Sequence, residues 1–327
     1  STSRRQRQMC IRDRFHPLQF LAALVQDMEI YEHTMATAIG PGEVLTPGGV
    51  IHAKAVVLAT HFPIVNVPGF FFFRMHQERS YVLALENAAP VGGMYIGEEK
   101  NSLSFRDAEG LLLFGGAGTR TGKNREGGNF EQLMQSAKVF YPACKAVYRW
   151  AAQDCMPHDQ IPYIGLLSEK WPGVYVATGF QKWGMTSSMA AAEILTDFIC
   201  GRENGDAPVF SPQRFHPFVS TPKLLIDGAQ TVYSIAKEKL EIPRETLFAI
   251  PNGTAAVVKV EGEKVGVYKT PDGGAYCVTV RCPHLGCRLE WNPAELSWDC
   301  PCHGSRFDYT GKLLNDPAQT GIEKAER

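Results

Sequence analysis

Two short motifs near the carboxyl end of the chain constrain its fold more than any other feature of the sequence. They read Cys282-Pro-His284-Leu-Gly-Cys287 and Cys300-Pro-Cys302-His303-Gly-Ser305, with fifteen residues between His284 and Cys300. Proline and glycine favour a tight loop at each motif, so four ligands from two loops can converge on one point. The sequence therefore predicts a metal centre. Its candidate ligands are Cys282, His284, Cys300 and His303.

The ligand types indicate which kind of centre this is. Structural zinc sites favour Cys-x2–4-Cys knuckles followed by His-x3–5-His, and an all-thiolate ferredoxin needs four cysteines and no histidine. Here each loop offers one cysteine and one histidine, and two further cysteines are left over. A Rieske [2Fe–2S] centre uses two cysteines on one iron and two histidines on the other. The spacing supplies that set.

Residues 242–327 closely resemble Rieske proteins, so we expect a small all-β domain there. Short apolar runs separated by glycine-containing turns agree with this fold. The resemblance implies that Cys287 and Cys302 form the loop-to-loop disulfide of the cytochrome-bc-complex branch of the family. It also matches Ser305 to the hydroxyl that donates a hydrogen bond to a bridging sulfide.

Two positions depart from the Rieske pattern. Phe307 stands where bc-type proteins usually carry a tyrosine that donates to a ligand cysteine. The missing donor predicts a reduction potential below that of respiratory Rieske proteins. Asp316 lies in the third, proline-bearing loop, where the family usually has glycine.

Charge and cysteine usage exclude several functional classes. The net charge of −1 provides no field that would recruit nucleic acid or an anionic membrane, and no run of 18 apolar residues is present to span a bilayer. Five of the nine cysteines lie between positions 277 and 302. This clustering favours a local metal site over a secreted disulfide scaffold. The dispersed cysteines indicate a reduced compartment, so we expect a cytoplasmic protein.

The sequence before the metal motifs mixes helical and strand patterns. The pattern therefore predicts an α/β domain with an extra sheet over residues 15–215 and a helical linker over residues 216–241. Residues 1–14 predict a non-native or disordered segment. Helices are expected over 15–29, 130–152 and 186–200, and strands over 55–60, 80–85, 111–114 and 173–177. The apolar run 68–73 predicts a further buried strand.

Residues 174–186, VYVATGFQKWGMT, have the pattern of a strand, a glycine-containing turn and a helix. Backbone amides at the start of such a helix would face an anion or a ligand carbonyl with the positive end of the helix dipole. An ordinary strand–helix turn with Thr186 as the N-cap has the same pattern. The segment alone leaves both interpretations open.

Three further motifs surround this segment: Phe15-His-Pro-Leu18, Val56-Val-Leu-Ala-Thr60-His-Phe-Pro63 and Asp159-Gln-Ile-Pro162-Tyr-Ile-Gly165. Together they resemble the second part of the D-amino-acid-oxidase-like FAD oxidoreductases, and more narrowly bacterial members with a Rieske domain fused at the carboxyl end. The resemblance implies FAD contacts from three places. They are Ala36 at the adenine, Ala59 and Thr60 near the phosphates and ribose, and Gly179, Lys182, Trp183, Gly184, Met185 and Thr186 at the isoalloxazine ring.

The resemblance names no catalytic residue. Substrate contacts in the family come from the extra sheet, which here includes residues 74–85. Lys182 either stabilises anionic reduced flavin or is a solvated lysine of the turn, and the sequence does not decide between these roles.

The glycine fingerprint of FAD-binding folds is missing from the expected place. A Gly-x-Gly-x-x-Gly motif should open the first βαβ unit, but no such motif precedes Phe15, and Gly115-Gly-Ala-Gly118 lies inside the expected extra sheet. The chain therefore looks like a fragment that lacks the first FAD-binding section. As given, it is expected to bind FAD weakly or not at all.

These features favour an FAD/iron–sulfur oxidoreductase. FAD would take two electrons from an amine or amino-acid-like C–N bond, and the cluster would pass them singly to an acceptor protein or a quinone. Two alternatives stay open at this point. One is a Rieske-type electron-transfer protein without substrate chemistry of its own. The other is a redox sensor in which the Cys287–Cys302 pair opens on reduction.

Overall fold

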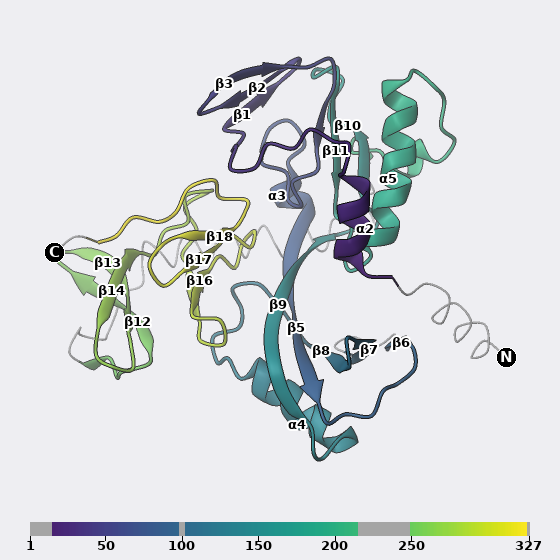
Figure 1. The fold of residues 1–327 in the computed structure, drawn as a ribbon. Coiled ribbons are helices and arrows are strands. Elements are labelled where there is room, and N and C mark those ends of the chain that lie inside the picture. Colours follow the sequence, from purple (N-terminus) through teal and green to yellow (C-terminus); the bar gives the residue numbers. More distant parts are fainter. Residues whose placement is uncertain (1–14, 98–101, 215–248, 326–327) are drawn as a thin grey trace. The chain divides into compact units, whose positions relative to one another are not determined.

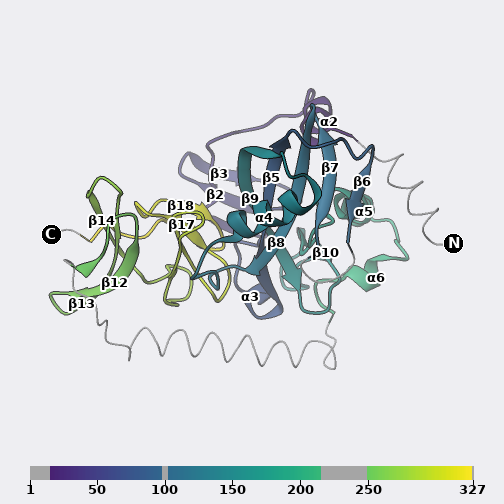
Figure 2. The same ribbon diagram turned by 90° about the horizontal axis from the view of Figure 1, so that it is seen from below.

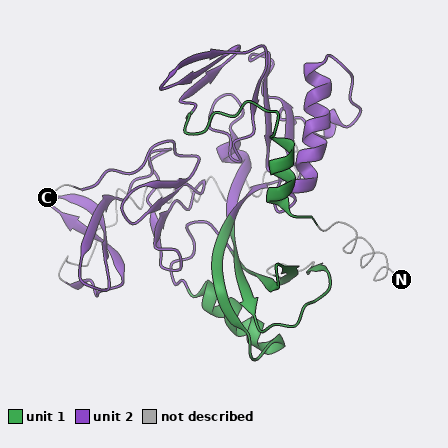
Figure 3. Ribbon diagram, viewed as in Figure 1, with its two compact units in different colours: residues 1–35, 79–118, 128–152 green, residues 36–78, 119–127, 153–327 purple. Residues whose placement is uncertain are grey.

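The computed structural model describes residues 15–97, 102–214 and 249–325, which form parts of two compact units (Figure 3). Unit 1 comprises residues 1–35, 79–118 and 128–152, and unit 2 comprises residues 36–78, 119–127 and 153–327. The segment 1–14 and the predicted linker 216–241 lie outside the described residues. The predicted boundaries between the domains therefore stay predictions.

A five-stranded sheet forms the body of unit 1, in the order β6-β7-β8-β5-β9, with antiparallel pairing of β6 with β7 and of β7 with β8. Its strands are β5 (Met75–Glu86), β6 (Met94–Ile96), β7 (Ser104–Ala108), β8 (Leu111–Arg120) and β9 (Lys145–Pro157), and its helices are α2 (Pro17–Leu24) and α4 (Asn129–Phe140). Residues 75–78 of β5 and 153–157 of β9 belong to unit 2. Helix α4 lies against the sheet (Figure 2), where Phe130 meets Tyr81 edge-on with 5.0 Å between ring centroids. The glycine-rich run 115–118 lies within β8, as the sequence predicts.

Two helix predictions in unit 1 are too long. The helix predicted over 130–152 ends at Phe140, and residues from Lys145 onward form strand β9. Proline disfavours a helical backbone in the residue before it, and Tyr141, which precedes Pro142, is already extended with φ of −135°. Helix α2 covers only part of 15–29, because none of its residues is buried and short helices need packing to persist.

The prediction of a buried strand over 68–73 is wrong. A turn precedes the short helix α3 (Phe71–Arg74), with φ of +113° at Gly69 and +50° at Phe70. These left-handed conformations cannot continue a strand. Phe71 is buried, whereas Phe70 and Phe73 are exposed, so only one of these rings belongs to the core.

The α/β part of unit 2 contains two small sheets. One has the order β1-β2-β3, with β1 (Ala38–Gly40), β2 (Glu43–Thr46) and β3 (Gly49–His52). The other has the order β10-β11-β4, with β4 (Val56–Leu58), β10 (Tyr163–Leu166) and β11 (Val174–Thr178); helices α5 (Gly184–Ile199) and α6 (Ala207–Phe210) pack beside it. Strands β4 and β11 and helix α5 confirm three predicted elements. No helix in the described ranges combines the length and apolar character needed to cross a membrane.

A buried ion pair closes this part of unit 2. The guanidinium of Arg214 donates to both carboxylate oxygens of Asp159, at 2.9 and 3.0 Å, and both side chains are only 5% exposed. The same guanidinium lies over the ring of Tyr163. Arg74 lies over that ring as well and donates to the carbonyl oxygen of Pro212 at 2.6 Å. The motif that starts at Asp159 is thus held by charge as well as by packing.

Residues 249–325 of unit 2 are all β, as predicted (Figure 1). A three-stranded antiparallel sheet contains β12 (Ala255–Val260), β13 (Glu263–Lys269) and β14 (Ala275–Thr279), and a four-stranded one contains β15 (Glu290–Asn292), β16 (Ser297–Asp299), β17 (Arg306–Asp308) and β18 (Leu313–Asn315). Trp298, Phe307 and Leu289 are at most 1% exposed and form the core of this region. The α/β region and the all-β region confirm the predicted fold class.

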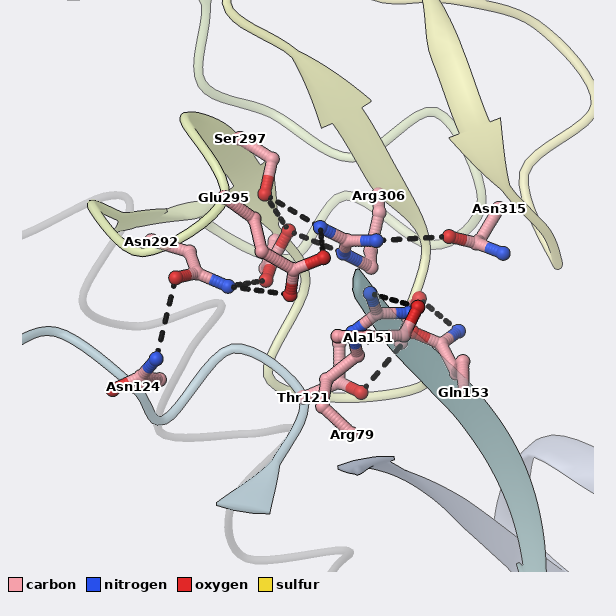
Figure 4. A network of polar contacts seen from close by, with 12 residues as sticks. Arg79, Thr121, Asn124, Ala151, Gln153, Asn292, Glu295, Ser297, Arg306 and Asn315 are labelled. Atoms are coloured by element: carbon pink, nitrogen blue, oxygen red, sulfur yellow. Dashed lines mark hydrogen bonds and ion pairs between the residues drawn. The ribbon is translucent and has the colours of Figure 1, made fainter. Parts of the chain in front are cut away.

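A buried polar network around Arg306 ties three strands together (Figure 4). Arg306 pairs with Asp299 at 2.9 Å and with Glu295 at 3.0 Å, and it donates to the side chain of Asn315 at 3.2 Å. Asp299 directly precedes Cys300, and Asn315 directly precedes Asp316. The network therefore fixes the strand ends from which two functional loops depart.

Candidate metal centre and cofactor-binding edge

Two loops carry the predicted metal ligands. Loop 1 (residues 281–288) connects β14 to β15, and loop 2 (residues 300–305) connects β16 to β17. The same two backbone hydrogen bonds close both loops. The N–H of the first cysteine donates to the carbonyl oxygen five positions later, and its carbonyl oxygen accepts from the N–H of the glycine four positions later. The pairs are Cys282–Cys287 and Gly286–Cys282 in loop 1, and Cys300–Ser305 and Gly304–Cys300 in loop 2, at 2.8–3.1 Å. Both glycines have positive φ, which favours glycine at this position of the turn.

The loops bring the four predicted ligands together. The rings of His284 and His303 meet edge-to-face with centroids 5.0 Å apart. The thiols of Cys282 and Cys300 share a hydrogen bond, which is the main cause that lowers the pKa of Cys282. Both thiols are at most 2% exposed. Such a set of two buried sulfurs and two adjacent imidazoles fits a cluster ligated by two cysteines and two histidines.

One nitrogen of His284 supports this fit. Its Nδ1 atom is buried and has no hydrogen-bond partner, although a buried imidazole nitrogen normally has one. The Nδ1 atom of His303 is buried too. A metal ion is a partner that would satisfy the Nδ1 atom of His284.

A disulfide links the two loops through Cys287 and Cys302. The sulfurs of Cys287, Cys300 and Cys302 lie within 4.8 Å of one another. Since two of them are bonded to each other, Cys300 is the thiol in this group that can bind a metal ion. The disulfide joins loop 1 to loop 2 next to the Cys300 thiol.

The third loop packs over the same core. The backbone N–H of Ala318 donates to the Oγ atom of Ser305 at 3.0 Å, and the Ser305 hydroxyl also contacts the Cys282 thiol. Phe307 is fully buried in the core cluster that contains Cys282 and Cys300. Ser305 and Phe307, which the resemblance to Rieske proteins singles out, therefore lie close to the proposed ligand cysteines: Ser305 contacts Cys282, and Phe307 shares a buried core with Cys282 and Cys300.

Residues from the α/β part of unit 2 contact the histidine side of the loops. The Oδ1 atom of Asn66 lies 2.7 Å from Nε2 of His284. The ring of Phe72 meets the rings of His284 and His303 edge-on, with centroids 6.1 and 5.7 Å away. Sequence analysis missed both Asn66 and Phe72, because no local pattern distinguishes an asparagine whose partner is 218 positions away.

Two buried glutamines grip loop 2 from strands β5 and β9. Gln77 donates to the carbonyl oxygen of His303 at 2.7 Å, and Gln153 donates to that of Gly304 at 2.9 Å. The two amides also share a hydrogen bond with each other. A Cβ atom added at Gly304 would lie only 2.7 Å from the Cβ atom of Gln77, so a side chain does not fit there. These contacts fix the backbone of loop 2 and were also missed.

The segment 119–127 lies along the other side of loop 2. Gly122, with φ of +74°, leaves no room for a side chain because the backbone of Pro301 occupies that position. Further along, Asn124 donates to the side chain of Asn292 at 3.3 Å (Figure 4), and Arg125 pairs with Glu290 at 2.8 Å. The metal-binding region is thus held from two sides within unit 2.

Parallel pairing of β4 with β11 gathers several predicted FAD contacts at one sheet edge. Leu58 pairs with Val176, so Ala59 and Thr60 after β4 lie near Gly179 after β11. Ligands of α/β sheets bind outside the carboxyl ends of parallel strands. Ala59 and Thr60 are exposed at this edge. Ala36 instead precedes β1, in the other small sheet.

The turn before α5 is open to solvent. Lys182, Trp183 and Gly184 are exposed, Met185 is half-buried, and helix α5 begins at Gly184 with Trp183 as its N-cap. Thr186 is therefore not the N-cap, and its hydroxyl donates to the carbonyl oxygen of Trp183 at 3.1 Å. An exposed helix start beside the ends of parallel strands fits a flavin cofactor.

The buried carboxyl of Asp316 should make the free energy of unfolding depend on pH. Burial raises the pKa of its carboxyl to about 7, against an opposing hydrogen bond from the Phe62 N–H. Unfolding restores a pKa near 4, so the folded state binds more protons between these values. Stability should therefore fall as pH rises from about 4 to 7, by about 2–4 kcal/mol. Urea titrations at pH 5 and pH 8 should show this loss in the parent and a much smaller one in Asp316→Asn. Equal losses in both proteins would contradict the assignment.

The comparisons with known proteins divide the chain in two. The family described as FAD dependent oxidoreductase, DAO, matches residues 11–198, and the Rieske [2Fe-2S] domain matches residues 245–326. The Rieske 2Fe-2S iron-sulfur protein YhfW of Bacillus subtilis is 36% identical over 319 residues, which cover 93% of this chain and 63% of YhfW. The chain thus spans less than two thirds of the length of that relative.

Two further proteins are similar to one region each. The cytochrome b6-f complex iron-sulfur subunit 2 of Trichormus variabilis is 35% identical over 94 residues, covering 27% of this chain and 53% of the subunit. The crystal structure of glycine oxidase from Geobacillus kaustophilus aligns with a TM-score of 0.50 and 21% identity, covering 57% of this chain and 53% of that one. The second match shows a shared fold.

Proposed function

This chain belongs to the FAD dependent oxidoreductase family and carries a Rieske [2Fe-2S] domain at its carboxyl end, and from that premise we propose an enzyme that oxidises an amine or amino-acid-like substrate. FAD supplies two-electron oxidation when bound, and the cluster supplies one-electron transfer. The amine is the substrate class to test first because this region shares its fold with glycine oxidase. An acceptor protein or a quinone in the cytoplasm would receive the electrons.

One observation carries this proposal. Residues of unit 2 outside its all-β region contact the loops of the metal centre at a side chain and at the backbone, through Asn66, Gln77 and Gln153. These contacts hold the cluster loops against the residues that precede the all-β region. An internal electron transfer needs them, because its rate depends on a fixed geometry between the two centres.

We assign the cluster ligands from the geometry of the two loops. Cys282 and Cys300 would bind one iron through their sulfurs, and His284 and His303 would bind the other through Nδ1. The Cys287–Cys302 disulfide would exclude water from the cluster, and Ser305 would donate a hydrogen bond on the sulfur side. Fixed donors and a dry environment both tune a reduction potential.

The FAD assignment rests on the sheet edge. Ala59 and Thr60 would lie near the phosphates and ribose, and residues 179 and 182–186 near the isoalloxazine ring. Backbone amides at the start of α5 would stabilise negative charge on the bound cofactor through the helix dipole. Ala36, at the start of a different sheet, would contact the adenine. Lys182 is exposed beside this turn and would add a positive charge.

Phe307 provides a test of the cluster environment. Phe307→Tyr adds a hydroxyl within the core that contains both ligand cysteines. One added hydrogen bond to a ligand sulfur should raise the potential by about 60 mV, which is about tenfold in the one-electron equilibrium. Protein-film voltammetry measures this shift, and Phe307→Leu serves as the control without a hydroxyl. A tyrosine variant with the potential of the parent would contradict the expected role of the missing donor.

The function itself can be tested without oxygen. Protein whose bound flavin and cluster have both been verified by absorbance is mixed with glycine and then with a panel of secondary amines. Flavin absorbance at 450 nm should bleach first, and the EPR signal of the reduced cluster should follow. A cluster that accepts electrons from dithionite but never from any amine would favour the Rieske-type electron carrier instead.

A further inference from the structure

The side chain of Asn66 covers the outer nitrogen of a predicted cluster ligand. Its Oδ1 atom lies 2.7 Å from Nε2 of His284, while Nδ1 of the same ring is buried and has no hydrogen-bond partner. If iron binds at Nδ1, Nε2 must carry the hydrogen. The contact is therefore a hydrogen bond donated by His284 to the amide oxygen of Asn66.

The segment that carries Asn66 starts at the proposed FAD edge. Thr60 stands only six positions before Asn66 in the chain. The hydroxyl of Thr178 at the end of β11 donates to the carbonyl oxygen of His61, and Gln319 of the third loop donates to that of Ile64 at 3.1 Å. One short, anchored segment thus joins the cofactor edge to the histidine side of the metal centre.

Asn66 and Phe72 together cover part of the histidine side, where His284 itself is half-buried. Phe72 meets both histidine rings edge-on, and His303 is only 2% exposed. The polar edge of His284 is occupied by Asn66. A hydroquinone that must hydrogen-bond to this edge would have to displace the asparagine first.

We propose that Asn66 is a positioning residue that accepts the Nε2 hydrogen of His284, lowers the reduction potential of the cluster, and reserves the histidine edge for electrons arriving inside the protein. The proposal rests on the proposed function for the source of those electrons. When both groups are bound, the reduced flavin would supply one electron, the cluster would accept it at a ferric iron, and His284 would keep its Nε2 hydrogen.

The direction of the effect follows from the hydrogen bond. An acceptor on the outer nitrogen makes the imidazole a stronger electron donor to the metal. A stronger donor stabilises ferric iron more than ferrous iron, and the potential falls. Removing the acceptor should raise the potential, and replacing it with a carboxylate should lower the potential further.

Two substitutions at this position therefore have opposite expected effects. Asn66→Ala should shift the oxidised-to-reduced equilibrium toward the reduced cluster by up to about tenfold, the worth of one hydrogen bond. Asn66→Asp should shift it the other way. Gln319→Ala is the matched control, since it removes another hydrogen bond to the same segment without touching a histidine. Iron content and circular dichroism verify that each variant folds and holds its cluster.

A second measurement tests whether Asn66 blocks access to the Nε2 atom of His284. Durohydroquinone is mixed with the oxidised, cluster-loaded chain, and cluster reduction is followed by absorbance. The Asn66→Ala variant should be reduced several-fold faster than the parent and Gln319→Ala. Potentials that move in the same direction in both Asn66 variants, or not at all, would overturn the proposal. Neither measurement uses an amine. The role of Asn66 can therefore be tested even if the protein does not oxidise amines.

Discussion

Cys300→Ala is expected to abolish the iron–sulfur cluster. The Cys300 thiol is 1% exposed, and the sulfurs of Cys287 and Cys302, which lie within 4.8 Å of it, are bonded to each other. No other thiolate in this group can take its place, and water does not reach the site readily. Iron and acid-labile sulfide should fall from two of each per chain to background, and the visible absorbance should disappear.

The control for this loss is another cysteine of the same region. Cys277→Ala alters strand β14, where the half-buried thiol has no proposed part in the cluster. It should keep its iron and its spectrum. Iron retained in Cys300→Ala, or lost equally from Cys277→Ala, would contradict the ligand assignment.

The second large effect concerns the buried ion pair of the α/β part. Asp159→Ala is expected to cost about 3–5 kcal/mol of unfolding free energy, because it leaves the Arg214 guanidinium buried without its counter-charge. Both side chains are only 5% exposed, and the pair is bidentate. The measurement is a urea titration followed by far-ultraviolet circular dichroism.

An exposed ion pair on α5 gives the comparison. Asp197→Ala breaks the contact with Arg202, whose side chain is 57% exposed. Water and salt screen such a pair, so only a small loss is expected. A loss in Asp159→Ala no larger than that in Asp197→Ala would show that burial does not strengthen the Asp159–Arg214 interaction.

The metal centre could be predicted because its information is local. Cys282 and His284, like Cys300 and His303, are separated by at most three positions, and glycines at fixed offsets set the loop conformation. A chemical pattern that lies within one loop survives any uncertainty about packing. The all-β character of the region followed from its turn residues for the same reason.

The contacts that hold the metal centre could not be predicted. Gln77 and His303 are 226 positions apart, and Asn66 and His284 are 218 apart. The sequence around a polar side chain does not indicate which distant carbonyl group or ring it will contact in the folded protein. The errors at 68–73 and 130–152 have another cause, since an apolar run fits a strand and a helix alike until Gly69 and Pro142 are given weight.

The account depends most directly on two histidines binding one iron of the cluster. Pulsed EPR of the reduced protein, prepared with ¹⁵N-histidine, measures this as hyperfine coupling to the labelled nitrogens. The account predicts strong coupling to two histidine nitrogens, with one lost in His284→Ala if any cluster is retained there. A reduced cluster without strong histidine coupling, or a protein that holds zinc in place of iron, would contradict it.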